Sequence, residues 1–89
     1  MVVYVEKNGI NVGVIQLDNN KLKFYFADPA CQEYLPQFKG RMWVGEVALV
    51  KFLLNHLGTS SKKLKSKEDL LKKLVLDSKS KDSLVFSYG

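Results

Sequence analysis

Residues 2–27 read VVYVEKNGINVGVIQLDNNKLKFYFA, three runs rich in strand-forming residues that are separated by two groups of turn-forming residues. Asn8-Gly9 tolerates the positive φ angles of a tight hairpin turn, and Asp18-Asn19-Asn20 has the composition of a second turn. Apolar and polar residues alternate in the second and third runs, which indicates strands with one buried face. The pattern predicts a three-stranded antiparallel meander. The side chains expected on its buried face include Ile10, Val12, Val14, Leu22, Phe24 and Phe26.

Two amphipathic segments further along the chain predict helices that cover this face. The first begins after Gly45 and runs to about Leu57, where Gly58 can end it. The second begins after Ser66, a favoured helix cap, and runs to about Leu76. Neither a meander nor a helix can bury its apolar side alone, so we expect them to pack together.

Three shorter segments complete the predicted fold. Asp28-Pro29 favours a short helical turn over 29–35, and 37–43 is expected to form an ordered loop. Residues 83–88 alternate again and predict a last strand that returns to the sheet. The sequence therefore predicts a single α+β domain over residues 1–89 with the order βββ(α)ααβ. Its antiparallel sheet has three or four strands, and its two main helices pack on one face.

Composition suggests where such a domain works. A lone cysteine, Cys31, cannot form an internal disulfide, and this favours a cytoplasmic or other reducing compartment. The N-terminus lacks the pattern of a signal peptide. The longest apolar stretch, 44–57, is interrupted by charged and polar residues and is too short to span a bilayer. We therefore expect no membrane association.

The chain carries little catalytic equipment. His56 and Cys31 are single representatives of the residue types that build most metal sites, which need several ligands. A Cys31–His56 nucleophilic pair is conceivable, but a histidine in the last turn of a helix and a small buried thiol explain both residues without chemistry. The carboxylates are scattered, and most of them belong to turns and helix starts. We expect no enzyme activity, no metal and no cofactor.

Positive charge gathers in the last third of the chain. Residues 59–89 carry eight lysines against four acidic residues, a balance of +4 within a total of +5. Lys62, Lys63, Lys65 and Lys67 form a cluster that predicts contact with a polyanion, and Lys39 and Arg41 are candidate additions. Because arginine is nearly absent, we expect the protein to contact the sugar-phosphate backbone of a nucleic acid, with little sequence specificity. The alternative is that the lysines only solubilise the surface.

A second candidate surface is the segment 38–43, which reads FKGRMW. Phe38, Met42 and Trp43 have the composition of a protein interface, and aromatic residues beside cations also suit stacking on bases. The alternative is that Phe38 and Trp43 belong to the core. An exposed sheet edge offers a third surface, for a protein partner or for a homodimer. The sequence thus leaves two functions open, nucleic-acid binding and protein binding as an inhibitor or adaptor.

Overall fold

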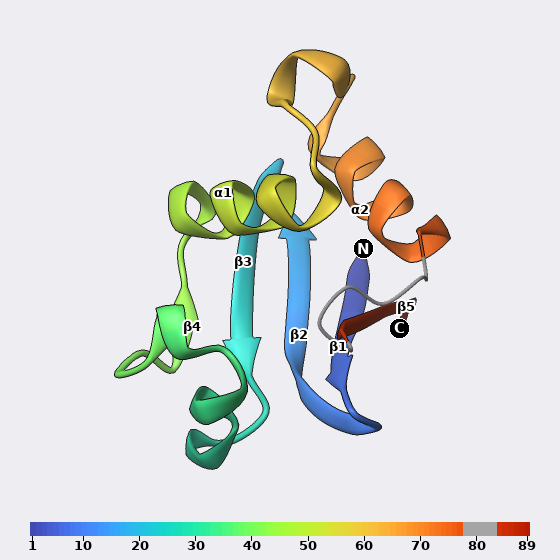
Figure 1. The fold of residues 1–89 in the computed structure, drawn as a ribbon. Coiled ribbons are helices and arrows are strands. Elements are labelled where there is room, and N and C mark those ends of the chain that lie inside the picture. The colour runs from blue at the N-terminus through green and yellow to red at the C-terminus, as the bar shows by residue number, and fades with distance from the viewer. Residues whose placement is uncertain (78–83) are drawn as a thin grey trace.

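A computed structural model describes residues 1–77 and 84–89 of the chain. Within these residues it contains one five-stranded antiparallel sheet with the strand order β4-β3-β2-β1-β5, accompanied by two α-helices and three 3-10 helices (Figure 1). The strands are β1 (Val2–Lys7), β2 (Ile10–Asp18), β3 (Lys21–Phe26), β4 (Trp43–Val44) and β5 (Leu84–Tyr88). The helices are η1 (Pro29–Tyr34), η2 (Pro36–Phe38), α1 (Glu46–Leu57), η3 (Ser61–Lys63) and α2 (Lys67–Leu76).

The predicted α+β class, the meander and both main helices are confirmed. The predicted return of the last strand is also confirmed, because β5 pairs antiparallel with β1 from Val3↔Tyr88 to Lys7↔Leu84. Residues 78–83, which include Ser83, the first residue of the predicted last strand, lie outside the described residues.

The sheet has five strands, one more than the larger of the two predicted counts. Trp43, the last residue of the segment predicted as a loop, forms β4 together with Val44, in which Val44 pairs with Phe24 and Trp43 pairs with Tyr25. A strand of two residues is too short to show alternation in sequence, and only its pairing with β3 makes it part of the sheet.

A β-bulge in β2 changes which residues face the core. Val5 pairs with Gly13 and Glu6 pairs with Asn11, so Val12 is an extra residue on β2. A bulge shifts the alternation by one position beyond it. The prediction that Val14 is buried was therefore wrong, because Ile15 takes that role and is fully buried. The prediction for Ile10 was also wrong, because this residue beside the hairpin turn is 44% exposed.

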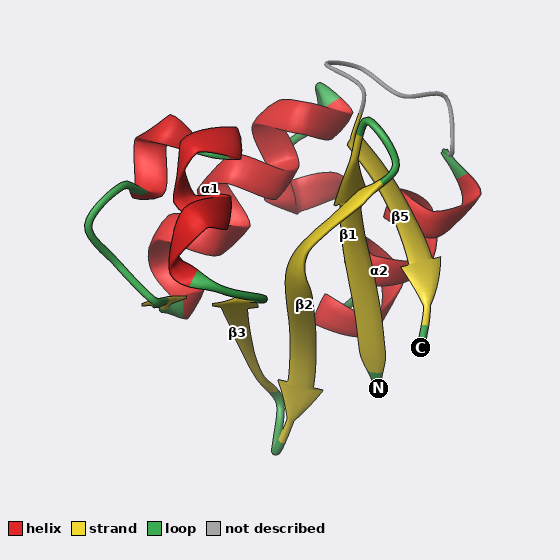
Figure 2. Ribbon diagram, turned by 90° about the horizontal axis from the view of Figure 1, so that it is seen from below, coloured by secondary structure: helices red, strands yellow, loops and turns green. Residues whose placement is uncertain are grey.

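The helices η1, η2, α1 and α2 contribute to a core on one face of the sheet. Figure 1 shows α1 lying across β3 and β2, and in Figure 2 α2 lies behind β1 and β5. Phe38 of η2 reaches the same core and packs edge-on against Phe52 of α1, with ring centroids 5.3 Å apart. The core residues of the two α-helices are Leu49, Leu53, Leu70, Leu71 and Leu74. No helix in the described part of the chain is long and apolar enough to cross a membrane.

The predicted caps explain where the helices begin and end. The Asp28 side chain accepts a hydrogen bond from the Ala30 N–H at 2.8 Å, and the Ser66 hydroxyl accepts one from the Asp69 N–H at 3.1 Å. Gly58 ends α1 in the left-handed conformation that glycine adopts without strain. The described helices all lie on one side of the sheet, and the helices of residues 1–77 leave its opposite face uncovered.

Candidate nucleic-acid interface

The uncovered side of the sheet, called the open face below, carries exposed aromatic and charged side chains. Its side chains alternate with the buried ones along each strand. Most of them are exposed, in contrast to the buried residues between them. The open face includes Val2, Tyr4, Glu6, Asn11, Val14, Gln16, Asp18, Lys21, Lys23, Tyr25, Trp43, Val85 and Ser87.

An aromatic row crosses the middle of the open face. Directly paired residues of the five strands form it, in the order Trp43, Tyr25, Val14, Tyr4 and Ser87. Directly paired residues point to the same side of a sheet, and neighbouring strands lie about 4.8 Å apart, so the row is about 19 Å long. Trp43 is 54% exposed and Tyr4 is 42% exposed. Such large exposed aromatic side chains in one line are uncommon on a surface that contacts only water.

Positive side chains run alongside the aromatic row. Lys23 lies directly across from Gln16 in the next row, and its Nζ sits 5.3 Å from the centre of the Trp43 ring. Lys21 follows one step further along β3, opposite Asp18. A hollow of about 260 Å³ opens here, lined by Gln16, Asp18, Asn19, Lys21, Lys23 and Tyr25. The open face therefore combines flat rings, cations and a shallow depression.

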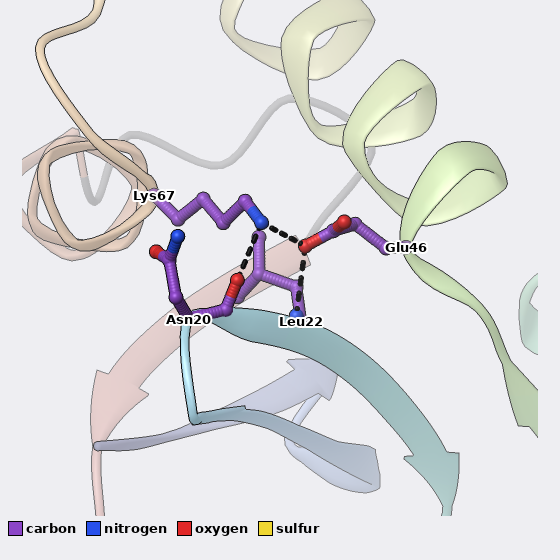
Figure 3. A network of polar contacts seen from close by, with 4 residues as sticks. All are labelled: Asn20, Leu22, Glu46 and Lys67. Atoms are coloured by element: carbon purple, nitrogen blue, oxygen red, sulfur yellow. Dashed lines mark hydrogen bonds and ion pairs between the residues drawn. The ribbon is translucent and has the colours of Figure 1, made fainter.

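Three of the four clustered lysines are exposed. Lys62 and Lys63 belong to η3, and Lys65 lies in the turn before α2. Lys67 is different, because its Nζ forms an ion pair with Glu46 Oε1 at 2.6 Å and donates to the Asn20 carbonyl oxygen (Figure 3). Lys67 thus ties α2 to α1 and to the β2–β3 turn. Its charge is already compensated, which makes it a poor candidate for a phosphate contact.

Glu46 is the centre of this network, as Figure 3 shows. Its Oε1 also accepts the Leu22 N–H at 3.1 Å. The N–H groups of alternate β3 residues point toward β4, and the Phe26 N–H is accepted by the Met42 carbonyl oxygen at 3.0 Å. The two-residue strand β4 is too short to reach Leu22, so the Glu46 carboxylate takes the place of the missing backbone acceptor.

Substitution of Glu46 by glutamine tests this network. Glutamine keeps an oxygen for the Leu22 N–H but removes the charge that faces Lys67. Because both side chains are about one-third exposed, we expect the free energy of unfolding at neutral pH to fall by about 1 kcal/mol or less.

The effect of Glu46→Gln should depend on pH. The hydrogen bonds from Lys67 and from the Leu22 N–H lower the pKa of Glu46 below its ordinary value. The stabilisation is therefore complete above the ordinary pKa of a glutamate and is lost as the pH falls through the lowered pKa. Urea unfolding of both proteins, from neutral pH to about pH 3, should show the two stabilities converging in acid. A difference that stays constant over this range would contradict the assignment.

The segment 38–43, predicted as a protein interface, contains both buried and exposed residues. Phe38 is only 4% exposed, so the prediction that it contacts a partner is corrected: it fills the core under α1. Met42 and Trp43 are exposed, as are Lys39 and Arg41. The Gln32 side chain holds the loop by accepting the Gly40 N–H at 2.8 Å. A second hollow, of about 500 Å³, lies beside Trp43 and is lined by Gly40, Arg41, Met42, Trp43 and Gly45.

Tyr4 and Tyr25 were not among the predicted site residues. The alternation of β3 places Lys21, Lys23 and Tyr25 on the side opposite the core. This side can bind a ligand only if no helix covers it, and the sequence does not show whether one does. The row is visible only once the register connects Tyr4 to Val14 and Tyr25 to Trp43. The alternation of β3 indicates the face of its residues, whereas only the strand pairing shows which residues lie beside them.

The residues considered for catalysis have structural contacts. The Cys31 thiol is buried and donates to the Asn11 carbonyl oxygen at 3.7 Å. The His56 ring packs against Phe86, with centroids 5.2 Å apart. Within residues 1–77 and 84–89, no three His, Cys, Asp or Glu side chains come together in a way that could hold a metal ion.

Comparisons of the chain with protein-family models, with curated proteins and with solved structures gave no match.

Proposed function

We propose that this domain binds single-stranded nucleic acid across the open face of its sheet. The observation that carries the proposal is the aromatic row of Trp43, Tyr25 and Tyr4, which lies on an uncovered sheet beside Lys21 and Lys23. Flat rings that receive bases and cations that receive phosphates are the two components that single-strand binding requires.

The rings favour an unpaired strand over a duplex. An exposed ring can stack on any base, whatever its sequence, provided that the base is not already stacked inside a helix. Other single-strand-binding sheets use aromatic residues on neighbouring strands to stack two or three bases. The three rings here are spread over strands β4, β3 and β1. Such a surface suits a short segment of about three or four nucleotides.

The lysines supply attraction without sequence selection. Lys21 and Lys23 border the row, and the exposed lysines Lys62, Lys63 and Lys65 precede α2, whose first residue contacts the β2–β3 turn at Asn20. The phosphates of a strand that leaves the open face over this turn would meet them next. Because lysine presents a compact charge rather than a bidentate fork, we expect similar affinity for unrelated sequences.

Fluorescence anisotropy tests the proposal with labelled single-stranded and duplex DNA and RNA of mixed sequence. We expect micromolar or tighter binding of single strands at low salt, weaker binding of the duplex, and a steep loss of affinity as salt rises. No binding at low salt, or an equal preference for duplex, would overturn the proposal. In the first case the open face would be a contact surface for a protein.

Substitution of Lys21 and Lys23 by glutamine should change the salt dependence. Each phosphate contact to a single strand contributes about 0.7 to the slope of log affinity against log salt concentration. We therefore expect the double variant to reduce the slope by about 1.4. The matched control is Lys51→Gln, an exposed lysine on α1 on the other side of the sheet. An unchanged slope in the double variant, or an equal change in the control, would remove these two lysines from the site.

A further inference from the structure

The two edges of the sheet are protected to different degrees. At the β4 edge, the Glu46 carboxylate accepts the Leu22 N–H, and the Met42 carbonyl oxygen accepts the Phe26 N–H. The strand itself is only two residues long. Very short edge strands and capped backbone groups are common ways of preventing another chain from adding to a sheet.

The β5 edge has none of the common protections within its described residues. Its sequence, LVFSY, contains no charge and no proline, and its pairing with β1 runs without a bulge. The Gly89 N–H donates to the Val2 carbonyl oxygen at 2.9 Å. Because backbone direction alternates along a strand, Leu84, Phe86 and Tyr88 therefore direct their N–H and C=O groups away from β1. Each of these three residues offers one donor and one acceptor at the edge of the sheet.

We infer that β5 is a dimerisation edge, which pairs antiparallel with β5 of a second copy of this chain about a two-fold axis at Phe86. In this register Phe86 pairs with the partner's Phe86, and Leu84 pairs with the partner's Tyr88. Every outward donor then meets an outward acceptor, because all three residues form hydrogen-bonded pairs. The contact is isologous, so the assembly closes at two copies.

The local charges allow this contact although the whole chain carries +5. β5 has no charged residue, so the paired strands themselves bring no like charges together. The exposed side of α2 nearby carries Glu68 and Lys72, which lie 4.0 Å apart and offset each other. Because β5 has no charged side chain, it offers no ion pair to a charged partner. An equally uncharged strand, such as β5 of a second copy, can pair with it without burying a charge.

The pairing would join the open faces of the two copies. The two-fold axis is perpendicular to the sheet, so both open faces lie on the same side of a continuous ten-stranded sheet, twice the five strands of one copy. Val85 of one copy would lie across from the partner's Ser87. A five-residue strand pairing buries less surface than a standard interface, so we expect a dissociation constant in the micromolar range.

Sedimentation equilibrium of the full chain, from low micromolar to submillimolar concentration, tests the inference. The wild type should pass from monomer to dimer. The double variant V85K/S87K places lysines directly opposite lysines at the contact and should weaken the dimer by about tenfold or more. In the monomer the lysine that V85K introduces lies across from Glu6, so circular dichroism should show an unchanged fold.

A second variant and a control separate this edge from other surfaces. Tyr88→Pro removes one outward N–H that β1 does not use, and it should also weaken the dimer. Val47→Lys introduces one lysine at an 87% exposed position on α1 and should leave the dimer intact. A wild type that stays monomeric throughout, or a dimer that survives both β5 variants, would overturn the inference. These outcomes are read without nucleic acid and are independent of its binding.

Discussion

We expect the replacement of Tyr4 and Trp43 together by alanine to lower the affinity for a single-stranded oligonucleotide by about thirtyfold or more. Each stacked base contributes about 1–3 kcal/mol when it rests on an aromatic ring, and the two rings stand on different strands of the row. The loss should be similar for DNA and RNA of unrelated sequence, because stacking does not select a base. Anisotropy titrations at constant salt measure it directly.

We expect the loss of affinity only when aromatic residues of the open face are replaced, and not when an exposed aromatic residue elsewhere is replaced. Tyr88 is 52% exposed but is paired with the buried residue Val3, so it points to the other side of the sheet. Tyr88→Ala is therefore the matched control and should leave the affinity within about twofold. The variant Y4A/W43A should keep its salt slope, because the lysines remain. Undiminished binding in that variant would show that nucleic acid binds elsewhere on the protein.

Gly13→Ala should be the most destabilising small substitution in the sheet. A Cβ at Gly13 would lie against the Tyr25 carbonyl oxygen and 2.5 Å from the ring carbon Cζ of Phe24. Phe24 is itself almost fully buried and packs edge-on against Phe26, with centroids 4.9 Å apart. Neither the backbone of β3 nor this ring can move without disturbing the core. We expect the free energy of unfolding to fall by about 3 kcal/mol or more, measured by urea denaturation.

Gly9→Ala separates the two reasons why a position requires glycine, which are a close contact at the Cβ position and a positive φ angle. A Cβ at Gly9 meets no atom within 4 Å, but its φ of +79° disfavours any side chain. The expected cost is about 1 kcal/mol, and it comes from the backbone alone. Equal effects of the two alanines would show that the ring of Phe24 adapts, and that the approach of Gly13 to β3 is less tight than the structure indicates.

The local elements could be predicted from the sequence because each rests on a few neighbouring residues. Asn8-Gly9 and the cap at Ser66 act within one turn, and the structure has both where they were predicted. The bulge at Val12 could not be predicted in this way. It depends on how β2 pairs with β1, and a single inserted residue moves Ile15 into the core and Val14 out of it.

The candidate site was less accessible to prediction for the same reason. The lysine cluster is a run in sequence and was noticed, yet Lys67 belongs to a network with Glu46 and Asn20, more than 20 and 40 residues away. Tyr4 and Trp43 lie at opposite ends of the meander and its following loop. Only the pairing of four strands places them in one row. Exposure of Trp43 and burial of Phe38 likewise follow from where β4 joins β3.

The position of β1 also affects how the chain folds during synthesis. Of the five strands, β1 is synthesised first, and its first neighbour, β2, follows directly in the chain. Its second neighbour, β5, is synthesised last, so Val3 can pair with Tyr88 only at the end of synthesis. At about 5–20 residues per second, a ribosome needs several seconds or more to supply that strand. During this time β1 is paired with β2 along one edge, while its other edge is free. Nascent chains on neighbouring ribosomes of one messenger RNA can pair through these free edges. Until β5 pairs with β1, the free edge of β1 is therefore the part of this sheet most exposed to misassembly with another chain.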